Sequence, residues 1–337
     1  HIHLSEWYTK NKRDLPWRST KNPYFLWLSE VILQQTRALQ GLPYYLKFTS
    51  QYPTIQDLAT ASSDDVMKTW QGLGYYSRAR NLHATAQYIT QELNGVFPNS
   101  YAEIIKLKGI GPYTAAAISS FAYGERKAVV DGNVYRVLSR YFNDSTPIDS
   151  TIGKKRFQQL ADELIKFAQP AQFNQAIMEL GATVCTPKLV KCTECPLNDS
   201  CEGFHMDTVY DLPIKGKKTK VVDRYLTYFI FKQGNETILK QRLEKDIWQG
   251  LYDFPLIDSN HPISSLEIEE YLTNRGIQKT ISIPKTIKHI LSHQRLHVQF
   301  IHINQHPPQL IDNERIVTDF ENYALPRVID KYLEQLK

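Results

Sequence analysis

All four cysteines of this 337-residue chain lie between positions 185 and 201, and this cluster restricts the possible folds more than any other feature. Their spacing is Cys185-x6-Cys192-x2-Cys195-x5-Cys201. Four thiolates within so short a segment can surround one metal centre, either a zinc ion or a [4Fe–4S] cluster. Zinc sites favour paired C-x2-C knuckles and only one such pair is present, so the spacing alone leaves both centres open. Four unrelated reduced thiols are the weaker alternative, because chance rarely groups a whole cysteine complement so tightly.

The residues around the cysteines offer no His or carboxylate placed to leave an open coordination position, so the centre is predicted to be structural. Lys188 and Lys191 lie between the first two cysteines, where they can meet a phosphate or simply face solvent. The opening residues, HIHLSEWYTKNKRD, contain no apolar signal-peptide segment, and no apolar run approaches the roughly 18 residues of a membrane span. We therefore expect a cytoplasmic protein without disulfides or a membrane partner.

Length and hydrophobic patterning divide the chain into two predicted domains. At roughly 100–200 residues per domain, 337 residues suggest two domains, each with its own core. Apolar residues recur at helical spacing throughout residues 1–205, for example in FLWLSEVILQQTRAL (25–39) and FNQAIMELGATVC (173–185). Residues 1–205 are therefore predicted to form a compact α-helical domain.

The composition and hydrophobic pattern change after the last cysteine. Residues 206–222 are rich in lysine and lack apolar periodicity, so they are predicted to be a linker. Residues 223–337 contain two predicted strands around a Gly-Asn turn, a second strand-rich stretch over 286–303 and an amphipathic helix near the end. Runs of strands with few helices predict an α+β module. The net charge of +5 permits a nucleic-acid partner without demanding one.

The segment LKGIGPYTA (107–115) joins two apolar-periodic helices through a short hairpin. Gly109 and Gly111 allow a tight turn with positive φ, and Pro112 sits where the second helix begins. Backbone N–H groups at such a helix N-terminus bind an anion, and on DNA that anion is a backbone phosphate. A G-x-G triplet alone favours an ordinary helix–helix turn, whereas the longer string L-x-G-I-G-x-x-T-A is far more specific.

This string resembles the hairpin of the helix-hairpin-helix DNA glycosylases. Asp131, in VVDGNVYRV, matches the superfamily's essential carboxylate, and the four cysteines follow with the spacing of its [4Fe–4S] motif. The resemblance is narrowed to one family of this superfamily by three further segments, LPWR (15–18), WLSEVILQQT (27–36) and GLGYYSRARNL (72–82). Together these motifs resemble the MutY adenine DNA glycosylases, which remove adenine mispaired with 8-oxoguanine. The resemblance extends over essentially the whole chain. The resemblance implies that the four cysteines hold an iron–sulfur cluster.

Two carboxylates occupy settings suited to breaking an N-glycosidic bond. Such chemistry needs an acid at the leaving group and an anion near the cationic sugar. Glu30 lies on a strongly apolar segment, where desolvation would raise its pKa and keep a proton available. Asp131 precedes Gly-Asn at a predicted helix N-terminus, which favours its ionised form. Without the resemblance, an exposed glutamate and a helix cap are the simpler interpretations of the two residues.

The resemblance assigns roles to further residues. It implies that Glu30 protonates adenine at N7, and that Asp131 stabilises the sugar cation or forms a transient adduct, with Asn133 in support. Tyr113 stands where strand-cleaving relatives such as endonuclease III carry a Lys that forms a Schiff base. A phenol cannot form one, so a monofunctional glycosylase is expected.

A base inside a duplex must be flipped out before it can be attacked, and the gap must be filled. By the resemblance, Gln35, Leu73 and Tyr75 probe and fill the base stack. Core packing is the simpler interpretation for such apolar and aromatic residues, and for Tyr76 we prefer it. Arg78 and Arg80 face either phosphate or solvent. The resemblance also implies that Trp17, Arg18 and Gln175 line the adenine pocket.

The last domain resembles MutT-like (Nudix) domains through IWQGLYDFP (247–255). Glu267, Glu269 and Glu270 follow without the Arg-Glu element and glycines of a working Nudix box, so we expect a catalytically dead recognition module. The segment HILSH (289–293) matches the loop that reads 8-oxoguanine in the family. Ser292 and His293 are kept there, whereas Leu291 replaces the usual Phe.

We therefore expect a monomeric, monofunctional adenine DNA glycosylase of the bacterial cytoplasm and nucleoid, acting on duplex DNA with adenine opposite 8-oxoguanine or guanine. An endonuclease III-like pyrimidine glycosylase with lyase activity is the nearest alternative, and Tyr113 argues against it. A Nudix pyrophosphatase and a non-catalytic iron–sulfur DNA-binding protein are more distant alternatives. The broken Nudix box disfavours the first, and the pair Glu30 and Asp131 disfavours the second.

Overall fold

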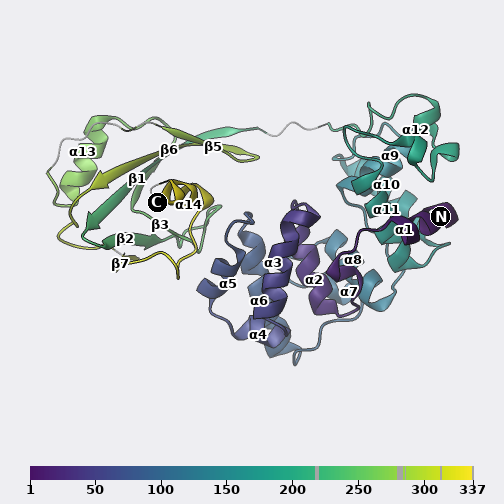
Figure 1. Cartoon of the computed structure of the whole chain (residues 1–337), viewed down its shortest axis with the longest axis horizontal. Helices are drawn as coiled ribbons and strands as arrows, with labels where there is room; N and C mark the ends of the chain where they lie inside the picture. The colour runs from purple at the N-terminus through teal and green to yellow at the C-terminus, as the bar shows by residue number, and fades with distance from the viewer. Residues whose placement is uncertain (217–219, 279–283, 285, 312, 336–337) are drawn as a thin grey trace. The chain divides into compact units, whose positions relative to one another are not determined.

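The computed structural model of the protein describes residues 1–216, 220–278, 284, 286–311 and 313–335. Contacts divide the chain into two compact units, His1–Thr60 with Asn81–Lys218 and Ala61–Arg80 with Thr219–Lys337. Helices make up the first unit, and the second contains a mixed β-sheet (Figure 1). The fold class predicted from the sequence, a mainly α part followed by an α+β part, is confirmed. Lys217 and Lys218 of the predicted linker lie outside the described residues.

The helices follow one another with short connections, as the sequence predicted. Two of them depart from the simple division of the chain, because α5 and the first residues of α6 group with the second unit. The helical elements before the sheet are α1 (Ile2–Asn11), η1 (Pro16–Arg18), α2 (Pro23–Leu33), α3 (Ala38–Gln51), α4 (Ile55–Thr60), α5 (Ser63–Trp70), α6 (Ser77–Glu92), α7 (Tyr101–Ile104), α8 (Pro112–Tyr123), α9 (Gly132–Tyr141), α10 (Thr151–Ile165), α11 (Pro170–Thr183), η2 (Cys192–Glu194), η3 (Asn198–Ser200) and α12 (Glu202–His205).

Local chemistry sets the starts of the two helices that matter most for function. Helix α8 begins with Pro112, whose fixed φ suits the first turn and whose missing N–H would have no partner there. Helix α9 begins after Asp131, whose carboxylate accepts hydrogen bonds from the backbone N–H groups of Asn133 and Val134. Gly109, in the turn before α8, adopts a φ of 76°, and a Cβ there would lie 2.6 Å from Asn81 Cβ.

Two apolar clusters hold the helices around a shared space. In one, the buried residues Leu26, Ala117 and Val129 join α2, α8 and the segment before α9. In the other, α1, α9, α10 and α11 pack around residues such as Phe157 and Leu180. Helices α2 and α9 are thereby fixed by separate cores. Glu30 lies in the last turn of α2, and Asp131 caps the start of α9. None of the helices within the described ranges has the length and apolar character needed to cross a membrane.

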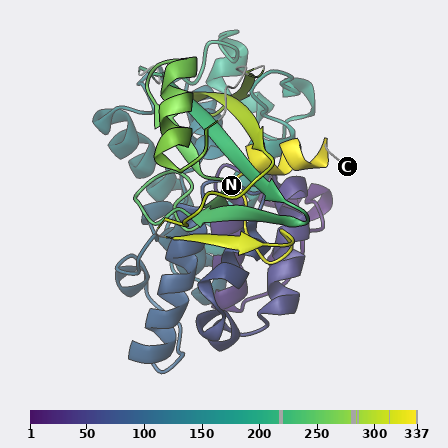
Figure 2. The same ribbon diagram turned by 90° about the vertical axis from the view of Figure 1, so that its left-hand side faces the viewer.

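The second unit is built on the long strand β1 (Val222–Gln233). It pairs in parallel with β6 (Gln294–Ile303) and turns through Gly234, at a φ of 60°, into antiparallel β2 (Glu236–Gln241). The sheet order is β3-β2-β1-β6-β5, with β4 paired to β1 and β7 to β2. Figure 2 shows β1 crossing this unit between α13 and α14. The remaining elements are β3 (Tyr252–Asp253), β4 (Leu256–Ser259), α13 (Ser265–Asn274), β5 (Ile287–Ile290), β7 (Glu314–Val317) and α14 (Arg327–Glu334).

The predicted turn, strand-rich stretch and C-terminal helix are all confirmed. The turn separates β1 from β2, residues 286–303 hold β5 and β6, and α14 spans Arg327–Glu334. One core of the unit forms where α13 covers buried residues of β1, β2 and β6, including Phe229, Phe231 and Ile301.

Candidate active site

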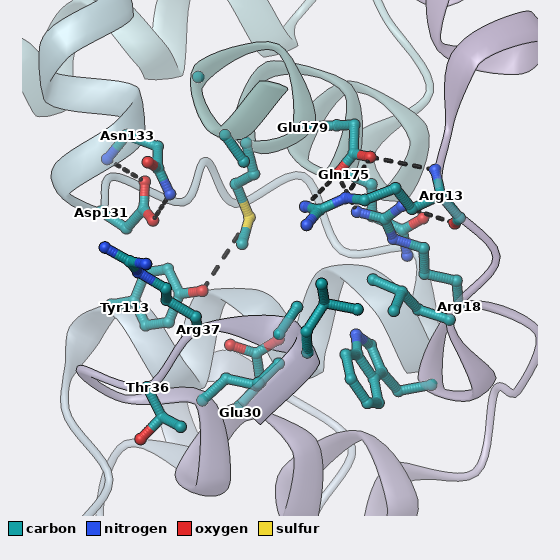
Figure 3. Close-up of a pocket in the computed structure, with 18 of the residues that line it drawn as sticks. Arg13, Arg18, Glu30, Thr36, Arg37, Tyr113, Asp131, Asn133, Gln175 and Glu179 are labelled. Atoms are coloured by element: carbon teal, nitrogen blue, oxygen red, sulfur yellow. Dashed lines mark hydrogen bonds and ion pairs between the residues drawn. The ribbon is translucent and has the colours of Figure 1, made fainter. Parts of the chain in front are cut away.

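A cavity of about 740 Å³ opens in the helical unit between α2, α8, α9 and α11 (Figure 3). The side chains that line it come from positions as far apart as Arg13 and Pro187. The cavity brings together all four residues predicted to be catalytic, all three of the predicted adenine pocket and one predicted probing residue. These are Glu30, Tyr113, Asp131, Asn133, Trp17, Arg18, Gln175 and Gln35.

Glu30 is buried on α2, with only 6% of its surface exposed. Burial raises the pKa of its carboxyl to about 7, a hydrogen bond with Tyr113 opposes the rise, and Asp131 adds to it. The residue therefore holds a proton over much of the neutral range, as the sequence predicted from its apolar surroundings. A carboxyl in this state is a proton donor for a bound molecule.

Asp131 accepts three hydrogen bonds where α9 begins. Two come from the backbone N–H groups of Asn133 and Val134, at 2.9 and 2.8 Å, and one from Asn133 Nδ2 at 2.8 Å. The expectation that the helix N-terminus would keep its pKa low is wrong: burial raises the pKa of Asp131, although these hydrogen bonds and Arg136 oppose the rise. Every bond is donated to the carboxyl, which is the pattern that suits its charged form.

Tyr113 lies in the first turn of α8, between the two carboxyl groups. Burial raises the pKa of its phenol well above the ordinary value, and Glu30 and Asp131 raise it further. The residue is thus a neutral hydrogen-bond donor, with Glu30 as its partner and Met178 Sδ at 4.0 Å. No amine stands at this position to attack a sugar carbon.

The opposite end of the cavity is built around Glu179, whose side chain is fully buried. Arg13 donates to it from Nε and Nη2 at 2.8 and 2.7 Å, and Arg18 Nη2 donates at 2.5 Å. Burial disfavours the charge, but the hydrogen bonds from both arginines lower the pKa of Glu179 to about 2. Arg18 is thereby fixed as a charged donor at the cavity wall.

Arg13 and Glu179 were not among the residues predicted from the sequence. Glu179 follows Gln175 by four residues on α11, so both lie on one helical face. That spacing was the available signal. The two arginines that meet Glu179 lie more than 160 positions away in the chain, so the sequence could not reveal them.

The other pocket residues shape its walls. Trp17 is buried and packs edge-on against Tyr45, with ring centroids 5.2 Å apart. Gln35 is exposed just after α2 and has a φ of 56°, a backbone conformation that few residues other than Gly and Asn adopt. A strained residue at the rim of a cavity fits a role in contact with a ligand.

Several predicted DNA-contacting residues do not line the cavity. Gly109 has the expected positive φ of 76°, but Gly111, the residue before α8, has a φ of −96°, so the prediction of a positive φ there is wrong. Leu73 is buried, whereas Tyr75 is 45% exposed with a φ of 47°. Within the second unit, Tyr75 shares a 3.3 Å hydrogen bond with Ser292, so two predicted DNA-reading residues meet there.

The two arginines after this segment are more enclosed than either sequence interpretation implied. Arg78 is buried and stacks over the rings of Trp70 and Tyr75, at 5.0 and 5.6 Å. It is therefore not solvated, and that interpretation was wrong. Arg80 Nη1 donates to the carbonyl of Gln249 at 2.5 Å. Tyr76 is buried, which confirms its interpretation as a core residue.

The four cysteines line one small pocket of their own. Burial raises the pKa of Cys195 to about 11, and the neighbouring thiols add to the rise, as sulfurs that share one site would. The guanidinium of Arg140, 2% exposed, lies against this pocket and donates to Cys185 Sγ at 3.4 Å. Across the described residues, no three His, Cys, Asp or Glu side chains come close enough to hold a single ion. Four sulfur donors in one pocket are a ligand set that suits either a [4Fe–4S] cluster or a zinc ion.

Arg136 connects the cysteines to the active site. Its guanidinium donates to Asn133 Oδ1 at 2.9 Å and to the carbonyl of Cys185 at 2.7 Å. Arg136 was not predicted from the sequence, although it lies one helical turn after Asn133. Of the two loop lysines, Lys191 pairs with Glu194 at 3.3 Å on the surface.

In the second unit, Ser292 and His293 form the exposed turn between β5 and β6. Their side chains share a 3.2 Å hydrogen bond, and the N–H of Leu291 closes the turn on the carbonyl of Gln294. Glu267 completes a capping box with Ser264 at the start of α13.

Two family models match separate parts of this chain. Residues 28–181 match the HhH-GPD superfamily of base excision DNA repair proteins, and residues 227–335 match the NUDIX domain. The adenine DNA glycosylase of Buchnera aphidicola (subspecies Baizongia pistaciae) is 35% identical over 99% of this chain and 95% of its own length. The human adenine DNA glycosylase is 45% identical over 59% of this chain and 38% of its own length.

Among solved structures, a thermostable thymine-DNA glycosylase matches with a TM-score of 0.56 and 29% identity. The match covers 61% of this chain and 94% of that one. A complex of endonuclease III with DNA matches with a TM-score of 0.52 at 21% identity, which shows the fold of the helical part. The full-length likeness and both domain matches lead to one assignment: this chain belongs to the adenine DNA glycosylases, within the HhH-GPD superfamily of base excision DNA repair proteins.

Proposed function

We propose that this protein is a monofunctional glycosylase that hydrolyses the N-glycosidic bond of adenine mispaired with 8-oxoguanine or guanine in duplex DNA. One observation carries the proposal. A buried carboxyl with a pKa raised to about 7, Glu30, shares one cavity with a second carboxyl that accepts three hydrogen bonds, Asp131. A proton donor and an anion in one cavity are what the bond cleavage requires.

In the proposed reaction, Glu30 donates its proton to N7 of the flipped adenine. The bond between N9 and the sugar C1′ then breaks, and its electron pair leaves with the neutral base. Asp131 stabilises the positive charge that develops on the sugar, with Asn133 Nδ2 holding the carboxylate in place. Water adds to C1′ and gives its proton to the Glu30 carboxylate, which restores the acid. Because Tyr113 cannot form a Schiff base, the abasic strand stays intact.

The end of the cavity that holds Arg18, Gln175 and Trp17 is proposed to bind the base. The exposed Arg37, at the start of α3, lines the same cavity and is suited to the charge of the DNA backbone. The hairpin residues Gly109 and Gly111 are proposed to bind a backbone phosphate through the N-terminus of α8, and Gln35, Leu73 and Tyr75 to probe and fill the stack. Duplex DNA is the proposed partner of a protein that acts as a monomer.

The four cysteines are proposed to hold a [4Fe–4S] cluster. When bound, the cluster supplies a structural crosslink for residues 185–201. Arg140 would contribute a hydrogen bond to the sulfur of Cys185, and Arg136 would fix the carbonyl of the same residue relative to Asn133. The protein thus ties the geometry of the cysteine loop to that of the active site.

We further propose a division of labour along the chain. Residues 1–205 excise the base, residues 206–222 connect the domains, and residues 223–337 identify the base opposite. Exposure of Ser292 and His293 in the turn between β5 and β6 supports their proposed contact with 8-oxoguanine, beside Leu291. The relatives of nearly equal length come from the bacterium Buchnera, which supports action on a bacterial nucleoid in the cytoplasm.

The test is base release from duplexes that carry adenine opposite 8-oxoguanine, guanine or thymine. Free adenine from the first two, with strand breaks only after alkali, is the expected result. The pyrimidine-glycosylase alternative is favoured by the likeness to the thymine-DNA glycosylase structure. It predicts thymine release from a T opposite G duplex and a borohydride-trapped adduct, and either result without adenine release would replace the proposal.

A further inference from the structure

A buried hydroxyl on α1 supports the proposed base pocket from behind. Tyr8 Oη donates a hydrogen bond to Gln175 Oε1 at 2.6 Å, across 167 positions of sequence. Tyr8 is only 4% exposed and does not line the cavity, whereas Gln175 does. Tyr8 therefore influences a bound molecule only through the side chains in front of it.

The hydroxyl determines which end of the Gln175 amide faces the cavity. Burial raises the pKa of Tyr8, with Arg18 opposing and Glu179 adding to the rise, so the hydroxyl keeps its proton at neutral pH. Its proton goes to the amide oxygen, and the amide nitrogen finds no hydrogen-bond partner within the described parts of the chain. An amide turned by 180° could still donate to the phenol oxygen, but the buried Tyr8 O–H would then have no acceptor among the described residues, so the hydrogen bond favours the orientation in which Tyr8 donates.

The neighbouring groups also present donors. Each oxygen of Glu179 already accepts two hydrogen bonds, Oε1 from the Arg13 N–H and Nε, and Oε2 from Arg13 Nη2 and Arg18 Nη2. Arg18 has donors only, and a further one is held by the carbonyl of Arg13 at 2.9 Å. This end of the cavity therefore presents N–H groups to a ligand, provided that Gln175 keeps its orientation.

We propose that Tyr8 is a positioning residue for base selectivity, which holds the Gln175 amide so that its N–H donors meet N1 of adenine. The inference rests on the proposed function. N1 of adenine is an acceptor, whereas guanine and hypoxanthine carry N1–H and present a donor instead. A fixed donor at this place therefore selects adenine, because two donors facing each other leave both unpaired in a desolvated pocket.

The variant Tyr8→Phe removes only the hydroxyl and keeps the ring, over which the Arg18 guanidinium lies at 5.7 Å. Tyr24→Phe is the matched control. Tyr24 is 5% exposed, donates to the carbonyl of Tyr52 at 2.7 Å and lies outside the cavity lining. Both variants lose the hydrogen bond that one buried hydroxyl group donates, so a general loss of stability affects them alike.

The substrates are duplexes that carry adenine or 1-deazaadenine, in which C–H replaces N1, opposite 8-oxoguanine. The preference for adenine is measured as a ratio of kcat/KM, and as a ratio of affinities with 2′-fluoro nucleotides, which resist cleavage. Loss of one fixed hydrogen bond lowers the preference of Tyr8→Phe roughly tenfold. Tyr24→Phe is expected to keep the wild-type preference.

A second comparison separates positioning from a structural role. The variant Gln175→Ala is expected to have lost the preference for adenine over 1-deazaadenine. Adding Tyr8→Phe to this variant is therefore expected to cause no further change in that preference. A Tyr8→Phe enzyme with the wild-type preference, or an additive effect in the Gln175→Ala background, would overturn the inference. Wild-type protein that releases no adenine would refute the proposed function instead, and the affinity ratio with 2′-fluoro duplexes would still decide the role of Tyr8.

Discussion

Arg136 lies one turn after Asn133 in α9, and its Nη2 donates to Asn133 Oδ1 at 2.9 Å. Its guanidinium also donates to the carbonyls of Gly181 at 2.6 Å and of Cys185 at 2.7 Å. Asn133 in turn donates to Asp131. A single 8%-exposed side chain therefore joins the carboxylate of the active site, α11 and the first cysteine.

Replacing this side chain should damage both sites at once. Arg136→Met leaves the carbonyls of Gly181 and Cys185 without these donors, and an unsatisfied buried group costs about 1–3 kcal/mol. We expect a lower midpoint of thermal unfolding, weaker visible absorbance from the proposed cluster and at least a tenfold slower release of adenine. Arg126→Met, at an exposed arginine, is the control. Equal midpoints and rates for the two variants would contradict the proposed link.

Glu30→Gln should bind a mispaired duplex normally and fail to release the base. The amide keeps the shape of the side chain but has no proton to donate, and general acid catalysis typically contributes about 10²–10⁴-fold. Single-turnover release measures the loss, and gel-shift affinity measures binding. Glu163→Gln, on the exposed face of α10 with Lys166 as its partner, is the control. Wild-type turnover by Glu30→Gln would remove its assigned role.

The rate of base release should depend on pH through the same carboxyl. Because the pKa of Glu30 is raised to about 7, the proton-bearing form dominates below pH 7 and declines above it. Under single-turnover conditions the rate should fall about tenfold per pH unit well above 7, if only the protonated form reacts. The profile is measured between pH 6 and 9 with saturating enzyme. A rate that stays flat to pH 9 would exclude Glu30 as the proton donor.

Much of this site could be predicted because the setting of each residue depends on its neighbours in the sequence. The apolar neighbours of Glu30 imply burial, and the Asp-Gly-Asn sequence implies a helix cap with free N–H groups. Both were found as expected. The pKa of Asp131 was predicted in the wrong direction, because a cap can be read from three residues, whereas the protein that buries it comes from distant elements.

The residues that were missed share one property, which is that their partners lie far away in sequence. Tyr8 meets Gln175, and Arg13 meets Glu179, across more than 160 positions. Hydrophobic periodicity shows which face of a helix is buried but not which side chain lies opposite. Arg78 illustrates the same limit, since a basic residue in a polar segment gives no sign that two aromatic rings cover it.

Ser292→Ala should weaken recognition of the opposite base without slowing the chemistry. Ser292 is exposed in the turn between β5 and β6, far from Glu30 in sequence, and one lost hydrogen bond is worth about 1 kcal/mol. The ratio of rates for adenine opposite 8-oxoguanine and opposite guanine should therefore fall about fivefold. Ser265→Ala, at an exposed serine of α13, should leave the ratio unchanged. An unchanged ratio in Ser292→Ala would show that other residues recognise 8-oxoguanine.

The two buried glutamates of the cavity should affect stability with opposite dependence on pH. Glu30 has a folded-state pKa of about 7, above the ordinary 4.5, so ionisation favours the unfolded state. The resulting loss in the free energy of unfolding is absent below pH 4.5 and grows between pH 4.5 and 7. It reaches about 3 kcal/mol at higher pH, because one pKa unit corresponds to about 1.4 kcal/mol. Glu30→Gln should therefore be more stable than the wild type at pH 8 and similar to it at pH 4.

Glu179 has a folded-state pKa lowered to about 2, so its charge stabilises the fold above pH 4.5 and this stabilisation is lost as pH falls towards 2. Glu179→Gln should therefore be less stable than the wild type at pH 8, by about 3 kcal/mol on the same scale. Unlike Glu30→Gln, it should still be less stable at pH 4. Urea unfolding of both variants at pH 4 and pH 8 measures the free energies. If the two substitutions shift stability in the same direction at pH 8, the charges assigned to the two ends of the cavity are wrong.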